Sequence, residues 1–392
     1  AASDVYKRQL ELSGLEVTPY PYQEEMLEAL RSEREIKDRH RNLLVAATGT
    51  GKTVVAALDY RNLCEQWKRR PRLLFVAHRK EILHQARRTF REVLKDADFG
   101  ELLVDGAEPH RWDFVFASVQ SLRASRLEQL DPKRFDVVII DEFHHAQAPT
   151  YNALLGHFQP RELLGLTATP ERGDGENVQK YFDYRVAHEL RLWDALRLQL
   201  LVPMHYYGIA DGTDLSSLTW IRGKKDYNSR ELSEFYIKAG EKRTRFIINE
   251  LNRRIFDLSE MKAIGFCVTI AHAKYMATQF QQFGIPARAV TNELSAVERA
   301  QAIRELEAGE VKVLFSVDIF NEGIDIPAVN TLLLLRPTQS PVVFLQQLGR
   351  GLRLSPGKDS CVIFDFIGQQ HADFDFERKF RACLLYTSDA AD

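Results

Sequence analysis

The sequence predicts an α/β protein made of two tandem domains, each a mostly parallel sheet flanked by helices. The chain has 392 residues, which is too long for one ordinary hydrophobic core. Short, continuously apolar runs alternate with helical patterns, as in sheets that are covered on both faces. Such strands are joined by right-handed crossovers, and ligands bind at the carboxyl ends of the strands.

Composition excludes several functional classes. Hydrophobic residues make up 45% of the chain and charged residues 28%, which is typical of a globular protein. The formal net charge is −2, so any nucleic-acid surface must be a local patch. Four cysteines without a paired metal spacing favour a reducing compartment, and we expect a cytoplasmic protein without zinc. No apolar run is long enough to span a membrane.

The two ends of the sequence are related at the level of coding DNA. Asp4–Gln9 can be encoded by GAT GTG TAT AAG AGA CAG, and the reverse complement of that DNA, shifted by one base, encodes Cys383–Ser388. This relation resembles a sequencing-library adaptor derived from a transposon end. We therefore expect residues 1–9 and 383–392 to be adaptor artefacts, with the natural chain continuing on both sides.

The rest of the chain divides into three parts. We expect a first α/β domain over residues 10–202 and a second over residues 241–382. Between them, residues 203–240 contain several glycines with weak periodicity, which predicts a connector. The expected strands are 42–46, 72–78, 114–122, 135–140, 163–167, 263–269, 287–290, 312–317, 331–335 and 361–366. The expected helices are 26–34, 54–67, 79–93, 238–256, 271–283, 296–307 and 342–348.

A phosphate-binding loop follows the first strand. The sequence Ala46-Ala-Thr-Gly-Thr-Gly-Lys-Thr53 leads from a strand into a helix, where backbone N–H groups and the helix dipole favour an anion. Lys52 would contact the β- and γ-phosphates of a nucleotide, and the Thr53 hydroxyl suits Mg²⁺. Ala46 replaces the first glycine of the usual pattern, which removes one flexible position. The loop residues expected to bind nucleotide are Thr48, Gly49, Thr50, Gly51, Lys52 and Thr53.

Two acids follow the apolar strand 135–140. Asp141 is placed to hold Mg²⁺ through water, and Glu142 to orient and deprotonate an attacking water. We expect His144 to couple hydrolysis to motion. Upstream, Gln23 precedes the phosphate loop and can contact an adenine edge with one acceptor and two donors. Its alternative role is a plain helix entry.

An arginine pair in the second domain completes the catalytic set. Arg350 and Arg353 are three residues apart, which predicts one helical face. Two planar guanidinium groups on one face can clamp a transferring phosphoryl group. The alternative is a solvated surface pair, but the phosphate loop in the first domain favours the catalytic interpretation.

In this order and spacing, the motifs resemble superfamily 2 helicases and translocases of the DExH type. The matching blocks are Tyr22-Gln23, Ala46–Thr53, Ala77–Gln85, Ser118–Leu122, Asp141–His144, Thr167–Pro170, Phe266–Ala273, Val317–Asp325 and Gln346–Arg353. The resemblance implies two RecA-like domains, ATP and Mg²⁺ in the cleft between them, and a nucleic-acid strand across both. It implies that Arg350 and Arg353 are arginine fingers supported by Gln346, and that Thr167 and Thr169 couple hydrolysis to domain motion. Gly323 and Asp325 would contact the nucleotide, and the strand path would be lined by His78, Arg79, Ser118, Gln120, Thr269 and His272.

Within the superfamily, three blocks look most like the restriction-type motor subunits of bacteria. They are Asp141–His145, Leu166–Arg172 and Asn321–Pro327. Such motors can be fused to a nuclease module, which lies outside this sequence, and the resemblance favours DNA over RNA. Two alternatives stay open: an RNA helicase, and a nucleotide-switched clamp that binds nucleic acid without unwinding it.

Overall fold

The computed structural model describes residues 14, 16–143, 149–170, 178–223, 225–317, 326–377 and 379. The chain divides into two compact units, Ala1–Arg191 and Leu192–Asp392. Both sequence ends expected to be adaptor artefacts lie outside the described residues. In the described part of the chain, no helix is both long and apolar enough to cross a membrane.

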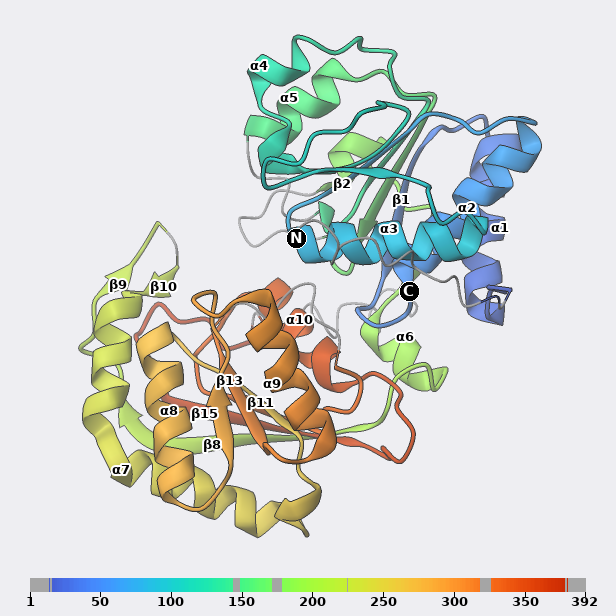
Figure 1. Cartoon of the computed structure of the whole chain (residues 1–392). Helices are drawn as coiled ribbons and strands as arrows, with labels where there is room; N and C mark the ends of the chain where they lie inside the picture. The colour runs from blue at the N-terminus through green and yellow to red at the C-terminus, as the bar shows by residue number, and fades with distance from the viewer. Residues whose placement is uncertain are drawn as a thin grey trace, which may run out of the picture. The chain divides into compact units, whose positions relative to one another are not determined.

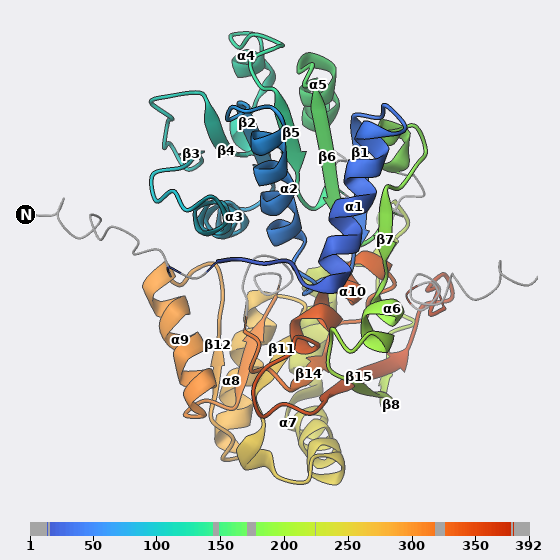
Figure 2. The ribbon, with the colours of Figure 1, turned by 90° about the vertical axis from the view of Figure 1, so that its right-hand side faces the viewer.

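The first unit, which contains the N-terminal half of the chain in Figure 1, is built on a seven-stranded sheet. Its strand order is β3-β4-β2-β5-β6-β1-β7, and the strands are labelled in Figure 2. Every neighbouring pair in this sheet is parallel. The strands are β1 (Arg41–Ala46), β2 (Leu73–Ala77), β3 (Glu101–Leu103), β4 (Phe114–Ser118), β5 (Val137–Ile140), β6 (Glu162–Thr167) and β7 (His188–Leu190).

Helices cover both faces of this sheet. Figure 2 shows α1 (Pro21–Glu35), α2 (Lys52–Gln66) and α3 (Lys80–Leu94) side by side on one face. On that face Phe90 of α3 packs against Phe75 and Phe116, with ring centroids 5.8 and 5.4 Å away. Alternate strand residues point the other way, towards α4 (Ala124–Leu127) and α5 (Pro149–His157). Short 3-10 turns lie at η1 (Val119–Ser121) and η3 (Val178–Phe182).

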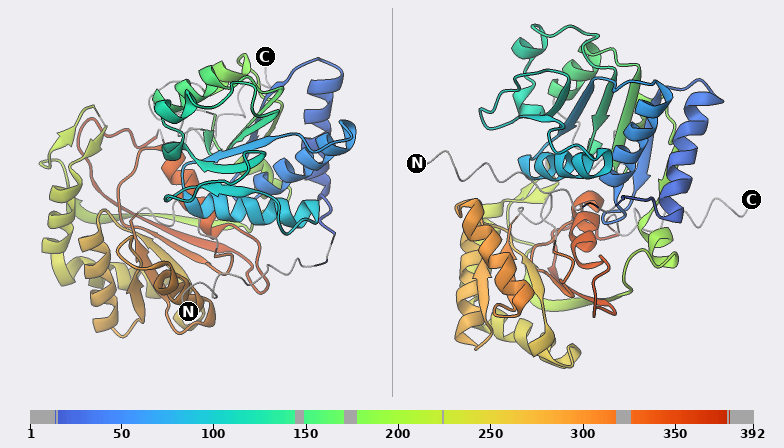
Figure 3. Two further views of the ribbon diagram at one scale, coloured as in Figure 1. Left: turned by 45° about the horizontal axis from the view of Figure 1, so that its top comes forward. Right: turned by 45° about the vertical axis from the view of Figure 1, so that its right-hand side comes forward.

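The second unit has a six-stranded sheet with the order β12-β13-β11-β14-β15-β8, again with all neighbours parallel. Its strands are β8 (Met204–Asp214), β11 (Ala263–Phe266), β12 (Ala287–Ala289), β13 (Val313–Ser316), β14 (Thr331–Leu334) and β15 (Cys361–Gln369). A separate hairpin pairs β9 (Trp220–Ile221) with β10 (Asp226–Tyr227); it is the yellow-green projection in Figure 3.

The helices of the second unit are α6 (Leu192–Arg197), α7 (Ser229–Arg254), α8 (Ile270–Gln282), α9 (Ala296–Ala308) and α10 (Pro341–Gly351), with a 3-10 turn at η4 (Leu258–Glu260). Helices α7 and α8 bury their apolar sides on one face of the sheet. Helix α10 packs on the opposite face, where Gly351 lies so close to Leu332 and Cys361 that an added Cβ would be 2.9 and 2.5 Å from them.

The predicted fold class is confirmed: both units are α/β with parallel sheets flanked by helices. The stretch 203–240 differs from the expected connector. It contains β8, which pairs with β15 and completes the second sheet, and the division between the units lies after Arg191. The short edge strand β3 was also not predicted. It has only three residues, of which Glu101 and Leu102 are half-buried, so it lacks a continuous apolar pattern.

A buried charge network ties three elements of the first unit together. The Arg34 guanidinium on α1 donates two hydrogen bonds to Asp59 of α2, at 2.6 and 2.7 Å. Its Nε donates to Glu162 of β6 at 2.9 Å. The three side chains are 8%, 5% and 3% exposed. Because one guanidinium serves both buried carboxylates, its removal would leave two buried negative charges without their cation.

We expect Arg34→Met to destabilise the first unit by about 3–5 kcal/mol, because it leaves two buried carboxylates without their cation. The measurement is urea-induced unfolding followed by circular dichroism. Arg31→Met is the matched control, since Arg31 on the same helix forms an exposed ion pair with Glu28. Equal stability of the two variants would contradict a structural role for the network.

The same network predicts a pH dependence through His40. Partial burial lowers the pKa of His40, but the hydrogen bond from its Nδ1 to Glu162, at 2.7 Å, and the charge of Glu162 outweigh this effect, and the net pKa is raised above 6.5. The stabilisation is therefore fully present below pH 6.5 and is lost as the pH rises through the raised pKa.

We expect His40→Asn to reduce the free energy of unfolding below pH 6.5 and to have a smaller effect at higher pH. Unfolding curves of both proteins across this range test the sign. A difference between wild type and variant that grows as the pH rises would show that the His40 interaction has been misassigned.

Candidate nucleotide and nucleic-acid sites

Three neighbouring strands of the first sheet bring the predicted nucleotide-binding residues to one edge. The strands lie in the order β5-β6-β1, with Ile140 opposite Gly165 and Val45 opposite Thr167. Because the strands are parallel, the phosphate loop after β1, Asp141 after β5 and Thr167 at the end of β6 all lie at the carboxyl edge. This is the edge where α/β sheets bind ligands.

The phosphate loop depends on two left-handed glycines. Gly49 has φ 96° and Gly51 has φ 81°, a region that side-chain-bearing residues rarely adopt. Gly51 is also the N-cap of α2, and Lys52 begins the helix. The helix therefore starts directly at the loop, which directs its N-terminal N–H groups to the site that an anion would occupy.

Lys52 is held over the loop. Its Nζ donates to the carbonyl oxygens of Ala46 at 2.9 Å and of Ala47 at 3.4 Å. The Thr50 hydroxyl donates to the Ala47 carbonyl at 2.8 Å. These contacts place the ammonium group among the loop carbonyls, where it is 8% exposed. The arrangement fits a phosphate group, because the ammonium group could exchange these neutral carbonyl acceptors for an anionic oxygen.

Gln23 contacts the phosphate loop directly. Its Nε2 donates to the Thr50 carbonyl at 3.3 Å, and its Oε1 accepts from the Tyr20 backbone N–H at 3.1 Å. A Cβ added at Gly51 would lie 2.7 Å from Gln23 Nε2, so a larger residue there would displace the end of the Gln23 side chain. The expected contact with adenine stays a prediction, while the structure shows that Gln23 supports the loop.

Asp141 is buried beside a second acid. Burial raises its pKa, and the charge of Glu142 raises it further, while Lys52 opposes the shift. The Glu142 backbone N–H donates to Asp141 Oδ1 at 2.9 Å, and Glu142 has φ 50°, a left-handed conformation. A buried carboxyl with a raised pKa would be stabilised in its ionised form by a nearby cation.

The oxygen donors at this edge are few, as in many Mg²⁺ sites. No group of three or more His, Cys, Asp or Glu side chains in the described part of the chain could hold a metal ion. Mg²⁺, however, commonly binds through one or two protein oxygens, with phosphates and waters as its other ligands. Asp141 and Thr53 therefore fit this ion when it arrives with a nucleotide.

The threonines after β6 form a compact turn. Thr167 Oγ1 donates to the Thr169 carbonyl at 2.7 Å and accepts from the Thr169 backbone N–H at 3.2 Å. Both residues are buried. The hydroxyls of Thr169 and of Thr48 in the phosphate loop have no hydrogen-bond partner among the described residues, which is consistent with a polar ligand at this edge. His144, expected to act with them, lies outside the described residues.

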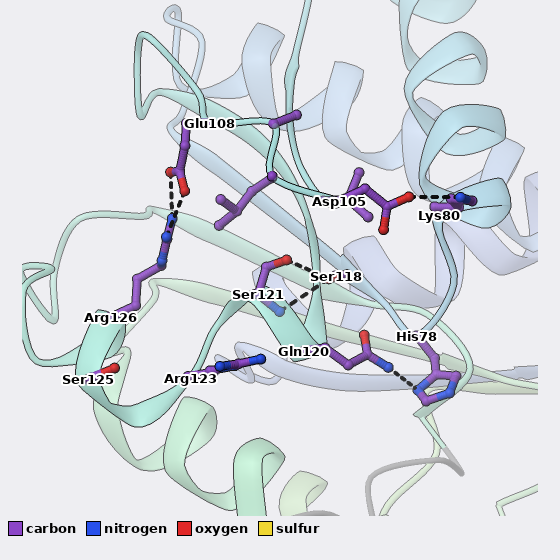
Figure 4. A pocket seen from close by; sticks show the side chains of 14 residues that line it. His78, Lys80, Asp105, Glu108, Ser118, Gln120, Ser121, Arg123, Ser125 and Arg126 are labelled. Atoms are coloured by element: carbon purple, nitrogen blue, oxygen red, sulfur yellow. Dashed lines mark hydrogen bonds and ion pairs between the residues drawn. The ribbon is translucent and has the colours of Figure 1, made fainter.

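A hollow of about 590 Å³ opens at the same edge, beyond β2 and β4 (Figure 4). His78 and Gln120, both predicted to contact nucleic acid, line it and bond to each other through Gln120 Nε2 and His78 Nδ1 at 3.0 Å. Arg79 occupies the N-cap position of α3, although its side chain makes no capping hydrogen bond. Ser118 also lines the hollow; it is 5% exposed, and its hydroxyl bonds to Ser121 at 2.7 Å, so its contact with nucleic acid stays a prediction.

Sequence reasoning missed three cations in this hollow, namely Lys80, Arg123 and Arg126. Two of them are paired with acids from one turn: Lys80 with Asp105 at 2.8 Å, and Arg126 with Glu108 at 2.5 and 2.7 Å. Arg123 directly follows the predicted block Ser118–Leu122, so its position could have suggested a role. Asp105 and Glu108 therefore place negative charge in the hollow, beside the cations that phosphates could contact.

In the second unit, Gln346 and Arg350 lie on α10 and are 4% and 8% exposed. Helix α10 ends at Gly351, so Arg353 lies beyond it. The prediction that both arginines share one helical face is therefore wrong. Gly349 and Gly351 weaken the end of the helix, since glycine is a poor helix former. Gly323 and Asp325 lie outside the described residues.

Thr269 and His272 stand at the start of α8. The Thr269 hydroxyl caps the helix by accepting from the His272 backbone N–H at 3.2 Å. His272 is 0% exposed, and its ring stacks on Tyr236 at 5.3 Å. Burial and the charge of Arg243 lower its pKa to about 3. The prediction that His272 lines a nucleic-acid path is corrected, because its side chain belongs to the core.

Comparison with known proteins supports the helicase interpretation of both halves of the chain. The family model for the res subunit of type III restriction enzymes matches residues 16–172, and the helicase conserved C-terminal domain matches residues 245–355. The chain belongs to the superfamily 2 helicases and translocases. Members of this family are ATP-dependent motors that act on nucleic acid.

Single relatives and solved structures are similar to most of the chain. IRC3 of Saccharomyces cerevisiae, named as an ATP-dependent helicase, is 30% identical over 82% of this chain and 48% of its own length. The chain thus spans about half of that relative. The fold resembles a fragment of an HsdR subunit of a type I restriction enzyme from Vibrio vulnificus, with TM-score 0.67, 23% identity and coverage of 91% and 65%. It also resembles the DNA-bound type ISP restriction-modification enzyme LlaBIII, with TM-score 0.69, 18% identity and coverage of 95% and 29%.

We expect Glu108→Gln to strengthen the binding of a single-stranded oligonucleotide by about two- to fivefold, because it removes the acid that competes for Arg126. Fluorescence anisotropy at fixed salt measures the affinity. Asp183→Asn is the control, since it removes the same charge from an exposed pair with Arg185 in the same unit. An equal gain in both variants would indicate a general charge effect.

Proposed function

We propose that this chain is the motor part of an ATP-dependent DNA helicase or translocase. The observation that carries the proposal is the convergence of the phosphate loop, Asp141 and Thr167 at one sheet edge. The likeness to restriction enzymes, one of them bound to DNA, favours DNA over RNA as the polymer. A nuclease module, fused or associated, and a cytoplasmic location are part of the same proposal.

In the proposed reaction, ATP is the substrate and Lys52 binds its terminal phosphates. Glu142 accepts a proton from water while the water oxygen bonds to the γ-phosphorus. The bond from this phosphorus to the bridging oxygen breaks, and ADP and phosphate leave. When bound, Mg²⁺ on Thr53 and Asp141 would neutralise part of the phosphate charge.

We assign the coupling of this reaction to movement to Thr167, Thr169 and His144. The hydrogen bonds within the Thr167–Thr169 turn make it a single unit, adjacent in the sheet to the strands that carry Asp141 and the phosphate loop. A change at the γ-phosphate would therefore alter a neighbouring turn as a whole. Gly323 and Asp325 are assigned to nucleotide binding on the resemblance alone.

The first test is ATP hydrolysis by the chain with single-stranded DNA, duplex DNA or RNA added. We expect DNA to stimulate turnover and Lys52→Ala to abolish it, because the substitution removes the phosphate-binding cation. Stimulation by RNA alone would identify an RNA helicase. Retained ATP binding without hydrolysis in the presence of any polymer would favour a nucleotide-switched clamp.

We expect Arg353→Ala and Arg350→Ala to bind ATP while turnover falls on the order of 10³–10⁵-fold, since a guanidinium stabilises the charge of the transition state. Equilibrium binding of a fluorescent nucleotide and steady-state hydrolysis separate the two effects. Arg304→Ala serves as the control, because Arg304 is exposed on α9 and donates a hydrogen bond to Gln301 of the same helix. Full turnover in either finger variant would remove that arginine from the mechanism.

A further inference from the structure

The β9–β10 hairpin is the one antiparallel pair among the named strands of the described chain. Asp226 pairs with Ile221, and Tyr227 with Trp220. Figures 1 and 3 show the hairpin projecting from the second unit, next to the start of α7. It follows β8 and precedes α7, and none of the helicase motifs includes it. A two-stranded hairpin of this size is not stable alone, so its surroundings must hold it.

Aromatic packing holds the base of the hairpin. Trp220 stacks on His371 with ring centroids 5.3 Å apart and planes 4° apart, and Tyr227 meets Trp220 edge-on at 5.0 Å. The Tyr227 hydroxyl donates to Gln370 at 3.0 Å and accepts from the His371 backbone N–H at 2.6 Å. Since residues 370 and 371 directly follow β15, the hairpin is fixed to the carboxyl end of that strand.

Polar contacts fix the second strand of the hairpin to the loop after β14. Arg336 Nη2 donates to Asp226 at 3.2 Å, and Gln339 Nε2 donates to the Lys225 backbone carbonyl. The hairpin is therefore anchored to the carboxyl ends of two adjacent strands, β14 and β15. This edge is where parallel α/β sheets bind ligands.

The tip of the hairpin, between its two strands, has the basic sequence Arg222-Gly-Lys-Lys225. Arg222 and Lys225 are exposed to solvent. No acidic residue occurs between Asp214 and Asp226, and the Asp226 carboxylate is engaged by Arg336. The chain as a whole has a net charge of −2, so this positive tip is a local feature.

We infer that the hairpin is a finger that contacts the phosphate backbone of nucleic acid through Arg222 and Lys225. The inference rests on the proposed function, because it assigns a further surface to the same polymer. Anchoring at both strands reduces the conformational entropy that the tip would lose on binding. Cations that neutralise phosphates release counterions, so each contact contributes to the salt dependence of binding.

The test compares the full chain with the double variant R222A/K225A. Neither substitution removes a side chain that anchors the hairpin, since Lys225 is held through its backbone carbonyl. Affinity for single-stranded and duplex DNA is measured by anisotropy over a series of salt concentrations. We expect affinity to fall by about tenfold at 0.1 M salt, and the slope of log K against log salt to decrease in magnitude by about 1.4–1.8.

The matched control is K242A/R253A, which removes two positive charges from exposed positions on α7. The charge-conserving variant R222K/K225R should restore both affinity and slope. An equal loss in R222A/K225A and K242A/R253A, or an unchanged slope in R222A/K225A, would overturn the inference and leave the tip a solvated turn. Failure of the wild-type chain to bind DNA or RNA would overturn the proposed function instead.

The unfolding midpoint of R222A/K225A shows whether a loss of affinity is caused by a loss of stability. A midpoint equal to that of the wild type, with reduced affinity, supports direct contact. If the midpoint falls, R222E alone is compared with R222K at the same salt concentrations. A loss of affinity confined to the charge reversal supports the inference, and equal affinities contradict it.

Discussion

Parallel pairing of β5, β6 and β1 is the constraint on which the first unit depends. Adjacent parallel strands end at the same edge of the sheet. Residues that are distant in sequence but directly follow these strands therefore become neighbours through strand pairing alone. The phosphate loop, the acidic pair and the threonine turn each occupy the first positions beyond their strands. The chemistry of the site is thus positioned by backbone hydrogen bonding in the sheet, and side chains refine it.

Close approach of α1 refines the phosphate loop. Gly51 is favoured by its left-handed backbone, and the end of the Gln23 side chain lies directly beside it. Gln23 in turn bonds to the Thr50 carbonyl, so the loop is held from outside as well as by α2. Buried Asp141, with the charge of Glu142 beside it, would be stabilised in its ionised form by a nearby cation. Loop shape and charge therefore favour the same ligand, a nucleotide with its metal.

The fold could be predicted because most strands are buried on both faces and appear as continuous apolar runs. β8 escaped prediction because it is an edge strand whose exposure alternates along its length, which resembles a connector. The residues expected to bind nucleotide could be named because their motifs have fixed spacing, and the sheet brings their strands to one edge. His272 was misjudged, since sequence alone does not show which side of a helix start is covered. Arg123 and Arg126 come together with Lys80 only through the fold.

The Arg34 network has a mechanical consequence. It joins the C-terminal end of α1, the middle of α2 and the start of β6, away from the ends that carry Gln23, Lys52 and Thr167. The three elements are therefore cross-linked at a point distant from the residues expected to bind nucleotide. A shift of one of these elements would therefore disturb the Arg34 hydrogen bonds to the other two. A single guanidinium thereby links the positions of two helices and one strand that lead to the carboxyl edge of the sheet.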